Sequence, residues 1–201
     1  MSGTTPRFIL ASASPSRALM LKDAGVSFDV HPAAVDEESV KHSMQAENAS
    51  LRDIADALAE LKALRVSSER EGLVLGADQV LLFEGELIDK VPQMSDARSL
   101  LKRLSGKQHQ LISAAVIAEA GQVVWRKIDQ ARLFMRSFSD EFLDQYLAAE
   151  GEAILAGVGC YRIEGRGAQL FSRIDGSLFT VRGLPLLDVL DYLRVRHVLT
   201  S

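Results

Sequence analysis

Asp78 is the residue whose type and surroundings most favour chemistry in this chain. It lies in the apolar run 73–82, and Gly76 and Ala77 beside it leave room for a ligand or for another backbone. An ionised carboxylate in a buried strand needs a metal, a cation or several hydrogen bonds. The sequence leaves two interpretations open, a site residue or a strand-end aspartate that bonds a neighbouring loop.

Two lysines could supply positive charge near Asp78. Lys62 lies four residues after Leu58 in a predicted helix, so both share its apolar face. A lysine in that position either extends to solvent or reaches an anion in a pocket. Lys90 follows a predicted hairpin, and it is either solvated or returns over the strand that carries Asp78.

The acidic trio Asp36, Glu37 and Glu38 is either a solvated loop or the source of one metal-binding carboxylate. One carboxylate of the trio together with Asp78 would suit a divalent cation, which takes oxygen ligands and retains several waters. The four histidines show no spacing typical of a metal site and are expected to carry no chemistry.

The segment 8–17 places two hydroxyls and a guanidinium at the start of a predicted helix. Ser14 is expected to be the N-cap, with Ser12 before it and Arg17 in the first turn. Free backbone N–H groups and the helix dipole favour negative charge at such a point. The segment is therefore either a phosphate-binding turn or an ordinary capped turn. The chain has no P-loop motif, and the glycine-rich stretch 157–167 does not fit the dinucleotide-binding pattern.

The elements that must position these residues alternate irregularly, which predicts a mixed α/β fold rather than a doubly wound sheet. Inward-facing residues of the first helices are expected to include Leu19, Met20 and Leu61. Helices are expected over 17–24, 47–66, 95–106 with Ser95 as N-cap, 139–151 with Ser139 as N-cap, and 186–196. Strands are expected over 8–11, 26–30, 73–83, 87–88, 110–118, 123–128, 131–138, 170–171 and 178–181.

Length and composition limit the number of domains, the classes of partner and the cellular compartment. The 201 residues, 47% of them hydrophobic, suit a single domain over 1–201. A net charge of −4 with interspersed signs disfavours long nucleic acids as partners. No apolar run approaches the roughly 20 residues of a membrane helix, and no secretory signal is evident, so no membrane association is expected. The single cysteine, Cys160, suits a reducing cytoplasm and is expected to be a small buried residue.

These features together resemble the Maf family of nucleoside triphosphate pyrophosphatases, from Ile9 to Leu193. The opening segment 10–17 is similar to the family's L-A-S-x-S-P-R-R signature, and 76–80 is similar to its G-A-D-[TQ]-V segment. Three later segments, 104–109, 164–168 and 183–186, follow in the family's order and spacing.

The resemblance implies an enzyme that cleaves a nucleoside triphosphate between its α- and β-phosphates with a divalent cation, Mg²⁺ or Mn²⁺. It also implies an anvil-like α/β fold related to inosine triphosphatase, and a homodimer. The implied catalytic residues are Asp78, Lys62 and Lys90, with Asp78 as the base that activates water. Asp36 and Asp78 are implied as metal ligands, and Ser12, Ser14 and Arg17 as substrate-binding residues.

Three positions depart from the family pattern. Ser16 replaces the first of two arginines, Val91 separates Lys90 from Pro92, and Glu164 stands where many members have glutamine. A glutamine donates and accepts hydrogen bonds, whereas an ionised glutamate only accepts. Glu164 is therefore expected either to alter base selectivity or to bring another carboxylate to the metal. Ser16 and Glu164 also leave open an alternative function, a catalytically weakened nucleotide-binding regulator linked to cell division.

Overall fold

The computed structural model describes residues 6–200, and their strands form one mixed sheet. The strand order is β2-β1-β3-β5-β6-β7, and β4 also pairs with β3. β1 runs parallel to β2 and β3, whereas β3 and β4, like β6 and β7, are antiparallel. The strands are β1 (Phe8–Leu10), β2 (Asp29–Val30), β3 (Leu73–Phe83), β4 (Glu86–Ile88), β5 (Gln108–Glu119), β6 (Gln122–Met135) and β7 (Phe171–Asp175). The mixed α/β prediction is confirmed.

Helices flank the sheet. The α-helices are α1 (Pro15–Asp23), α2 (Glu37–Ala46), α3 (Leu51–Ser67), α4 (Met94–Leu104), α5 (Asp140–Glu150), α6 (Leu178–Val181) and α7 (Leu186–Val195). Two 3₁₀ helices, η1 (Gly151–Ala156) and η2 (Arg166–Leu170), lie between α5 and β7. Within the described residues, no helix combines the length and the apolar character that crossing a bilayer requires.

The chain divides into two compact units, and three strands contribute residues to both. The first unit comprises the described residues of Met1–Asp78, Ser113–Asp129 and Gly183–Ser201. The second comprises Gln79–Ile112 and Gln130–Arg182. The family signatures are thus divided between units, with Asp78 ending a segment of the first and Gln79 beginning a segment of the second.

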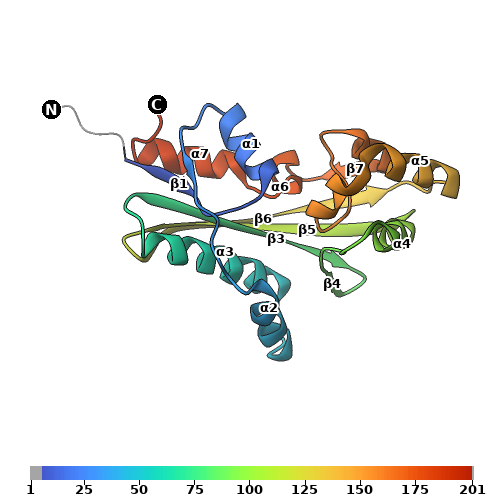
Figure 1. Cartoon of the computed structure of the whole chain (residues 1–201), viewed down its shortest axis with the longest axis horizontal. Coiled ribbons are helices and arrows are strands. Elements are labelled where there is room, and N and C mark those ends of the chain that lie inside the picture. The colour runs from blue at the N-terminus through green and yellow to red at the C-terminus, as the bar shows by residue number, and fades with distance from the viewer. Residues whose placement is uncertain (1–5, 201) are drawn as a thin grey trace. The chain divides into compact units, whose positions relative to one another are not determined.

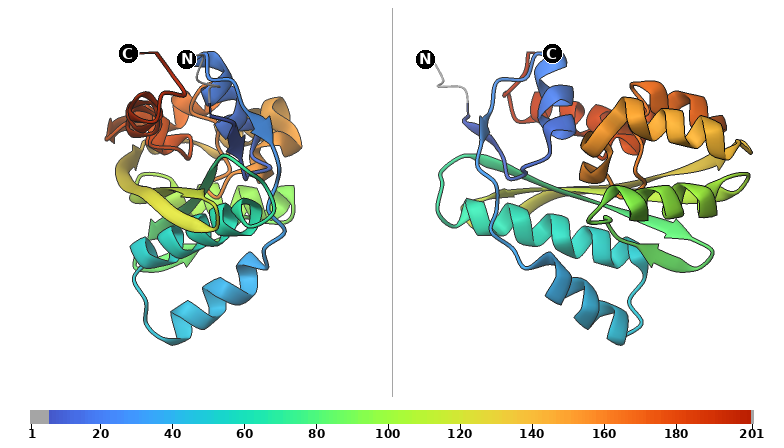
Figure 2. Two further views of the ribbon diagram at one scale, coloured as in Figure 1. Left: turned by 90° about the vertical axis from the view of Figure 1, so that its left-hand side faces the viewer. Right: turned by 45° about the vertical axis from the view of Figure 1, so that its right-hand side comes forward.

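In the first unit, helices cover both faces of the strands. α3 lies on one face, and α1 and α7 lie on the opposite face (Figure 1). One stripe of α3 is buried, comprising Ile54, Ala55, Leu58, Ala59, Lys62, Ala63, Val66 and Ser67. Figure 2 shows α2 at an angle to α3, with a short connection between them. The spacing of the stripe, in pairs four residues apart, is what places Lys62 on the buried face.

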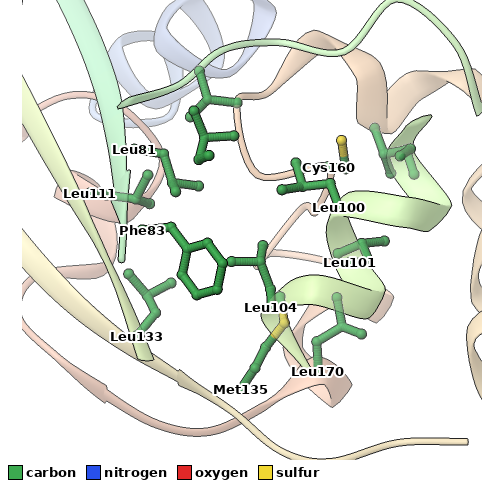
Figure 3. Close-up of a cluster of buried hydrophobic side chains, with 14 of the residues drawn as sticks. Leu81, Phe83, Leu100, Leu101, Leu104, Leu111, Leu133, Met135, Cys160 and Leu170 are labelled. Carbon is green, nitrogen blue, oxygen red and sulfur yellow. The ribbon is translucent and has the colours of Figure 1, made fainter. Parts of the chain in front are cut away.

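The second unit has its own apolar core, which Figure 3 shows in close-up. Leucines of α4 meet Phe83 of β3 and Leu133 of β6 there, and Cys160 lies beside Leu100. As expected, Cys160 is buried, and burial raises the pKa of its thiol to about 11. The thiol is therefore an inert core group rather than a nucleophile.

Several local predictions were wrong. No element was expected over 37–46, but these residues form α2. None of them is buried, so no apolar stripe marks the helix in the sequence. Residues 178–181 form α6 rather than a strand, because Ser177 caps the turn and Leu178 is exposed. The two strands predicted over 123–138 are one strand, β6.

Helix ends and faces also differ from expectation. α4 begins at Met94, so Ser95 lies inside it and Gln93 is its N-cap residue. Leu19 and Leu61 are exposed rather than inward. The helix predicted from residue 47 begins at Leu51, where the hydroxyl of Ser50 caps it. The predictions that Ser14 and Ser139 cap helices are confirmed.

Candidate functional site

A buried ion pair joins Asp78 of β3 to Lys62 of α3. The Lys62 ammonium lies 2.7 Å from Asp78 Oδ1 and 2.8 Å from Glu37 Oε1. Asp78 is only 5% exposed and Lys62 only 7%. Because buried charges need partners, this geometry favours the site interpretation of both residues over a strand-end aspartate and a solvated lysine.

Gly76 explains why α3 comes so close to β3 at this point. A Cβ at position 76 would lie 2.5 Å from the Ala63 nitrogen and would overlap the Ala59 carbonyl oxygen. The turn of α3 that holds Lys62 therefore rests directly on the backbone of β3, two residues before Asp78. Only glycine allows this approach, and the approach sets the separation of Lys62 from Asp78.

Arg17 is buried and binds other parts of the protein. Its Nε donates to the Gly183 carbonyl at 2.8 Å, and its Nη1 donates to the Ala77 carbonyl at 2.9 Å. Nη1 also donates to Ser12 Oγ at 3.1 Å. Two of the three guanidinium nitrogens thus join α1 to the strand that carries Asp78 and to the segment before α7. The opening signature and the segment 183–186 are therefore in direct contact in this chain.

The two serines of the opening turn also make internal hydrogen bonds. Ser12 Oγ accepts from the Ser14 backbone N–H at 3.2 Å, and Ser14 Oγ accepts from the Arg17 backbone N–H at 3.4 Å. A hydroxyl that accepts a bond still has a proton to donate. The turn is therefore ordered in advance, with hydroxyl protons that an anion can use.

Opposite charges are matched around Asp78. Burial lowers the pKa of the Arg17 guanidinium, and the negative charges of Asp78 and Glu37 oppose this effect. Two cations, Arg17 and Lys62, thus face two carboxylates. Arg17, Lys62 and Asp78 are buried and Glu37 is partly exposed, and a set of charges that balance is far less costly to bury than any one of its members alone.

Asp78 keeps one oxygen for a further partner. Its Oδ2 is buried and accepts no hydrogen bond from the residues that the structure describes. Among those residues no group of three or more His, Cys, Asp or Glu side chains gathers as a metal cage would. Mg²⁺ is usually bound by one or two carboxylates plus substrate phosphates, so an unpartnered buried carboxylate oxygen beside a second carboxylate fits such an ion.

The structure separates the roles of the acidic trio. Asp36 is the N-cap residue of α2, and its Oδ1 accepts from the Ser39 backbone N–H at 3.0 Å. Glu37 follows and reaches Lys62. Glu37 therefore shares Lys62 with Asp78, whereas the resemblance implies Asp36, and a metal-binding role for either carboxylate stays a prediction. Asp36 is exposed and caps α2, whereas Glu37 is partly buried in its first turn. This difference can be seen only once α2 is known to start at residue 37.

Two predicted site residues belong to the second unit. Lys90 is exposed in the segment after β4. Glu164 lies in the segment between η1 and η2, with its Oε1 3.8 Å from Arg162 Nε. Gln79 donates to the backbone carbonyls of Thr180 and Val181 at 2.9 and 3.2 Å, which ties β3 to α6 within this unit. The structure brings Ser12, Arg17, Lys62 and Asp78 together in the first unit, and the roles of all the predicted site residues stay predictions.

A family model and several named proteins match nearly the whole chain. A family model described as Maf-like protein matches residues 7–196. A protein of Caulobacter vibrioides named nucleoside triphosphate pyrophosphatase is 49% identical over 191 residues, covering 95% of this chain and 96% of the relative. Proteins of the same name from Granulibacter bethesdensis and Ruegeria pomeroyi are 48% and 49% identical. They are matched over 96% and 98% of this chain, and over 99% and 100% of their own lengths.

Proposed function

This chain belongs to the Maf-like protein family, and from that premise we propose that it hydrolyses a nucleoside triphosphate to a nucleoside monophosphate and pyrophosphate. Relatives of nearly equal length bear the name of this activity. The observation in the molecule that supports it most is the buried Asp78 carboxylate, with Oδ1 on Lys62 and Oδ2 without a partner among the described residues.

Asp78 acts as the base in this proposal. A water bound at Oδ2 attacks the α-phosphorus, its proton passes to Oδ2, and the bond to the β-phosphate oxygen breaks so that pyrophosphate leaves. Lys62 holds Oδ1, so Oδ2, which has two lone pairs, is the oxygen left for the water and for a cation. Arg17 keeps the end of β3 in place through the Ala77 carbonyl, one residue before Asp78. Positioning and charge neutralisation are the main sources of rate in phosphoryl chemistry.

A divalent cation, Mg²⁺ or Mn²⁺, is part of the proposal. Asp78 would hold it together with one carboxylate of the trio, Glu37 by its position or Asp36 by the resemblance. When bound, such an ion neutralises phosphate charge and polarises the phosphoryl oxygens. Glu37 then has two roles, because it also shares Lys62 with Asp78.

Substrate contacts are assigned to the remaining predicted residues. The hydroxyls of Ser12 and Ser14 donate to phosphate oxygens from the turn before α1, where the helix N-terminus favours negative charge. Arg17 orders that turn from within. Lys90 is assigned to phosphate charge by the resemblance alone. Glu164 is assigned to N–H groups of the base, because an ionised glutamate only accepts hydrogen bonds and is repelled by phosphate.

The proposal is tested by replacing the base. Asp78→Asn retains the size of the side chain and removes its proton-accepting charge, so pyrophosphate release should fall by at least about 10³-fold. Asp191→Asn, which makes the same change on the exposed surface of α7, is the control and should retain full activity. Release is measured with normal, methylated and oxidised nucleoside triphosphates, with and without Mg²⁺.

Two results would reject the proposal. Wild-type protein that binds nucleotides but releases no pyrophosphate from any of them would point to the regulatory alternative. An Asp78→Asn variant as active as the wild type would remove the base assignment. Circular dichroism of the variant shows whether a loss of activity reflects a loss of fold.

Localisation and assembly complete the proposal. A cytoplasmic enzyme accords with the single buried cysteine, because cytosolic thiols stay reduced. The resemblance implies a homodimer, which sedimentation equilibrium of the purified chain would detect as a molecular mass of twice 22.0 kDa.

A further inference from the structure

One side of α7 faces solvent and carries two large apolar residues. Leu187 is 62% exposed and Val195 is 65% exposed, the highest values among the large hydrophobic residues that the structure describes. Asp191 and Arg194 complete this side, because residues four, seven and eight positions after Leu187 share one face of a helix. We call these four residues the α7 stripe. Single exposed leucines are ordinary on protein surfaces, so the stripe indicates a contact only together with the features beside it.

A shallow hollow lies beside the stripe, between α7 and β6 and wholly within the first unit. Its volume is about 390 Å³, and it is lined by Trp125, Lys127, Asp188, Asp191, Tyr192 and Val195. The rings of Trp125 and Tyr192 stack in it, with centroids 5.4 Å apart and planes at 21°. Tryptophan and tyrosine in a surface hollow are the residues that contribute most to protein–protein contacts.

Polar contacts hold the walls of the hollow in place. The Tyr192 hydroxyl accepts from Arg196 Nη1 at 2.9 Å, and Arg196 Nη2 donates to Glu119 of β5 at 2.7 Å. Lys127 of β6 lies 2.6 Å from Asp188 of α7, which ties the helix to the strand across the hollow. Because these side chains are already ordered, a partner that enters the hollow pays little entropy to fix them.

The charges of the α7 stripe differ from the others on this helix. Asp188 is paired with Lys127, whereas the exposed side chains of Asp191 and Arg194 make no ion pair or hydrogen bond with any residue that the structure describes. One acid and one base without partners, three residues apart, form a self-complementary set. Each can meet its opposite on a second copy of the same surface, which is what a two-fold contact requires.

We propose that a second copy of this chain binds the α7 stripe, with the two α7 helices antiparallel about a two-fold axis at Asp191. Leu187 of each copy then packs against Val195 of the other, at the rim of the hollow, because each residue lies four positions from the axis. Asp191 of each copy pairs with Arg194 of the other. Their offset of about 4.5 Å along the helices is within the reach of an arginine side chain. Every contact is made twice, once in each direction.

The size of the surface sets the expected strength. α7 has 10 residues, so two such helices bury less than the roughly 1,200 Å² of a stable interface. We therefore expect a reversible dimer with a dissociation constant of about 10 µM. The inference names the surface of the homodimer included in the proposed function. None of its residues is proposed for catalysis, so pyrophosphate release per chain should be the same in monomer and dimer.

The test exchanges the two charges. Asp191→Arg and Arg194→Asp each place like charges opposite one another at both ends of the axis, so each should weaken association at least about tenfold. The double variant restores opposite charges and should return to within about threefold of the wild type. Two defects in folding would add rather than cancel, so this recovery is specific to the proposed pairing. Sedimentation equilibrium between about 0.5 and 200 µM gives the dissociation constants.

A second measurement follows the apolar part of the contact. Leu187→Asp should weaken association at least about thirtyfold, because a charge then meets Val195 and the hollow. Leu61→Asp makes the same change at an exposed leucine of α3, on the opposite face of the sheet (Figure 1), and should leave association unchanged. Trp125 is the single tryptophan of the chain, so its fluorescence reports on the hollow. Its emission should shift to longer wavelength when the wild type is diluted, but not when Leu187→Asp is diluted.

Three outcomes would overturn the inference. A wild type that is monomeric at the highest concentration removes both the homodimer and this surface. A dimer that persists in Leu187→Asp or in Asp191→Arg removes the surface and leaves the homodimer. A double charge variant as weak as the single variants removes the antiparallel pairing, provided that circular dichroism shows all of them folded. None of these results depends on pyrophosphate release, so the hydrolytic function is judged separately.

Discussion

Lys62 is the residue on which the charges of the site depend. It is buried between Asp78 and Glu37, at 2.7 and 2.8 Å. Removing one member of a buried ion pair leaves the other charged and unpaired, which costs more than the pair itself contributes.

We therefore expect Lys62→Met to lower the free energy of unfolding by about 3 kcal/mol at neutral pH. The same substitution should lower pyrophosphate release by at least about 10²-fold, because Asp78 Oδ1 loses its anchor. Urea denaturation monitored by circular dichroism gives the first quantity. Adding Asp78→Asn should restore part of the stability, since the unpaired charge is then gone, and no recovery would mean that packing rather than charge explains the loss.

Individual site residues could be predicted from the sequence where apolar neighbours surround a charge. Asp78 among β3 residues and Lys62 beside Leu58 stand out for that reason, and the structure pairs them. Glu37 did not stand out, because adjacent helical residues point about 100° apart and only the start of α2 decides which carboxylate faces Lys62. The charge of Arg17 is visible in the sequence but the direction of its side chain is not, because its partner Gly183 is 166 residues away.

Among the elements, the contact between α3 and β3 is the one that sets the site. It has no side chain at its centre, because Gly76 meets the backbone of Ala59 and Ala63 directly. A side chain there must move the helix, and Lys62 moves with it.

Gly76→Ala should consequently destabilise the protein by about 3 kcal/mol through overpacking, and it should reduce activity although no proposed catalytic group is changed. Gly157→Ala is the matched control, because a Cβ at position 157 would meet nothing closer than 3.8 Å. The free energy of unfolding of this variant should stay within about 0.5 kcal/mol of the wild-type value. Thermal melts and pyrophosphate release measure the two effects. Equal stability of the two variants would contradict the close approach.

The elements were predictable where a pattern is long and one-sided. The apolar run of β3 and the buried stripe of α3 are such patterns, and both elements were expected within a few residues. α2 buries no residue, so its helix rests on the Asp36 cap and its contact with α3 rather than on periodicity. The short segment 178–181, with three apolar residues and Thr180, fits a strand or a helix equally, and the Ser177 cap decides for α6.

For the whole molecule, His109 makes stability depend on pH. Its pKa is lowered by burial to about 4 in the folded protein, against about 6.5 in an unfolded chain. Between these values the unfolded chain binds a proton that the folded protein does not. The contribution of neutral His109 to the free energy of unfolding is therefore fully present above pH 6.5. It is lost as the pH falls to about 4, by about 3 kcal/mol in total.

The stability advantage of the wild type over His109→Phe should accordingly shrink by about 3 kcal/mol between pH 7 and pH 4. Urea denaturation of both proteins at several pH values measures this difference, and other titrating groups cancel in it. A difference that stays constant over that range would show that His109 titrates alike in both states.

Composition and hydrophobic pattern sufficed for the fold class, because strands and helices of both kinds of spacing alternate irregularly. They gave no indication that the chain forms two compact units from five segments. That division depends on which side chains gather around Phe83 and Leu104 rather than around Ile9 and Val74, and such distant contacts leave no periodic trace in the sequence.

The bond from Arg17 to Gly183 has a consequence for biosynthesis. On the ribosome, Arg17 is made 166 residues before the carbonyl that its Nε needs. At about 5–20 residues per second, the guanidinium waits on the order of ten seconds with its charge exposed to solvent or held by a chaperone. The opening turn can reach its final order only after Gly183 has left the ribosome, so any activity that needs this turn appears at once after that point rather than gradually.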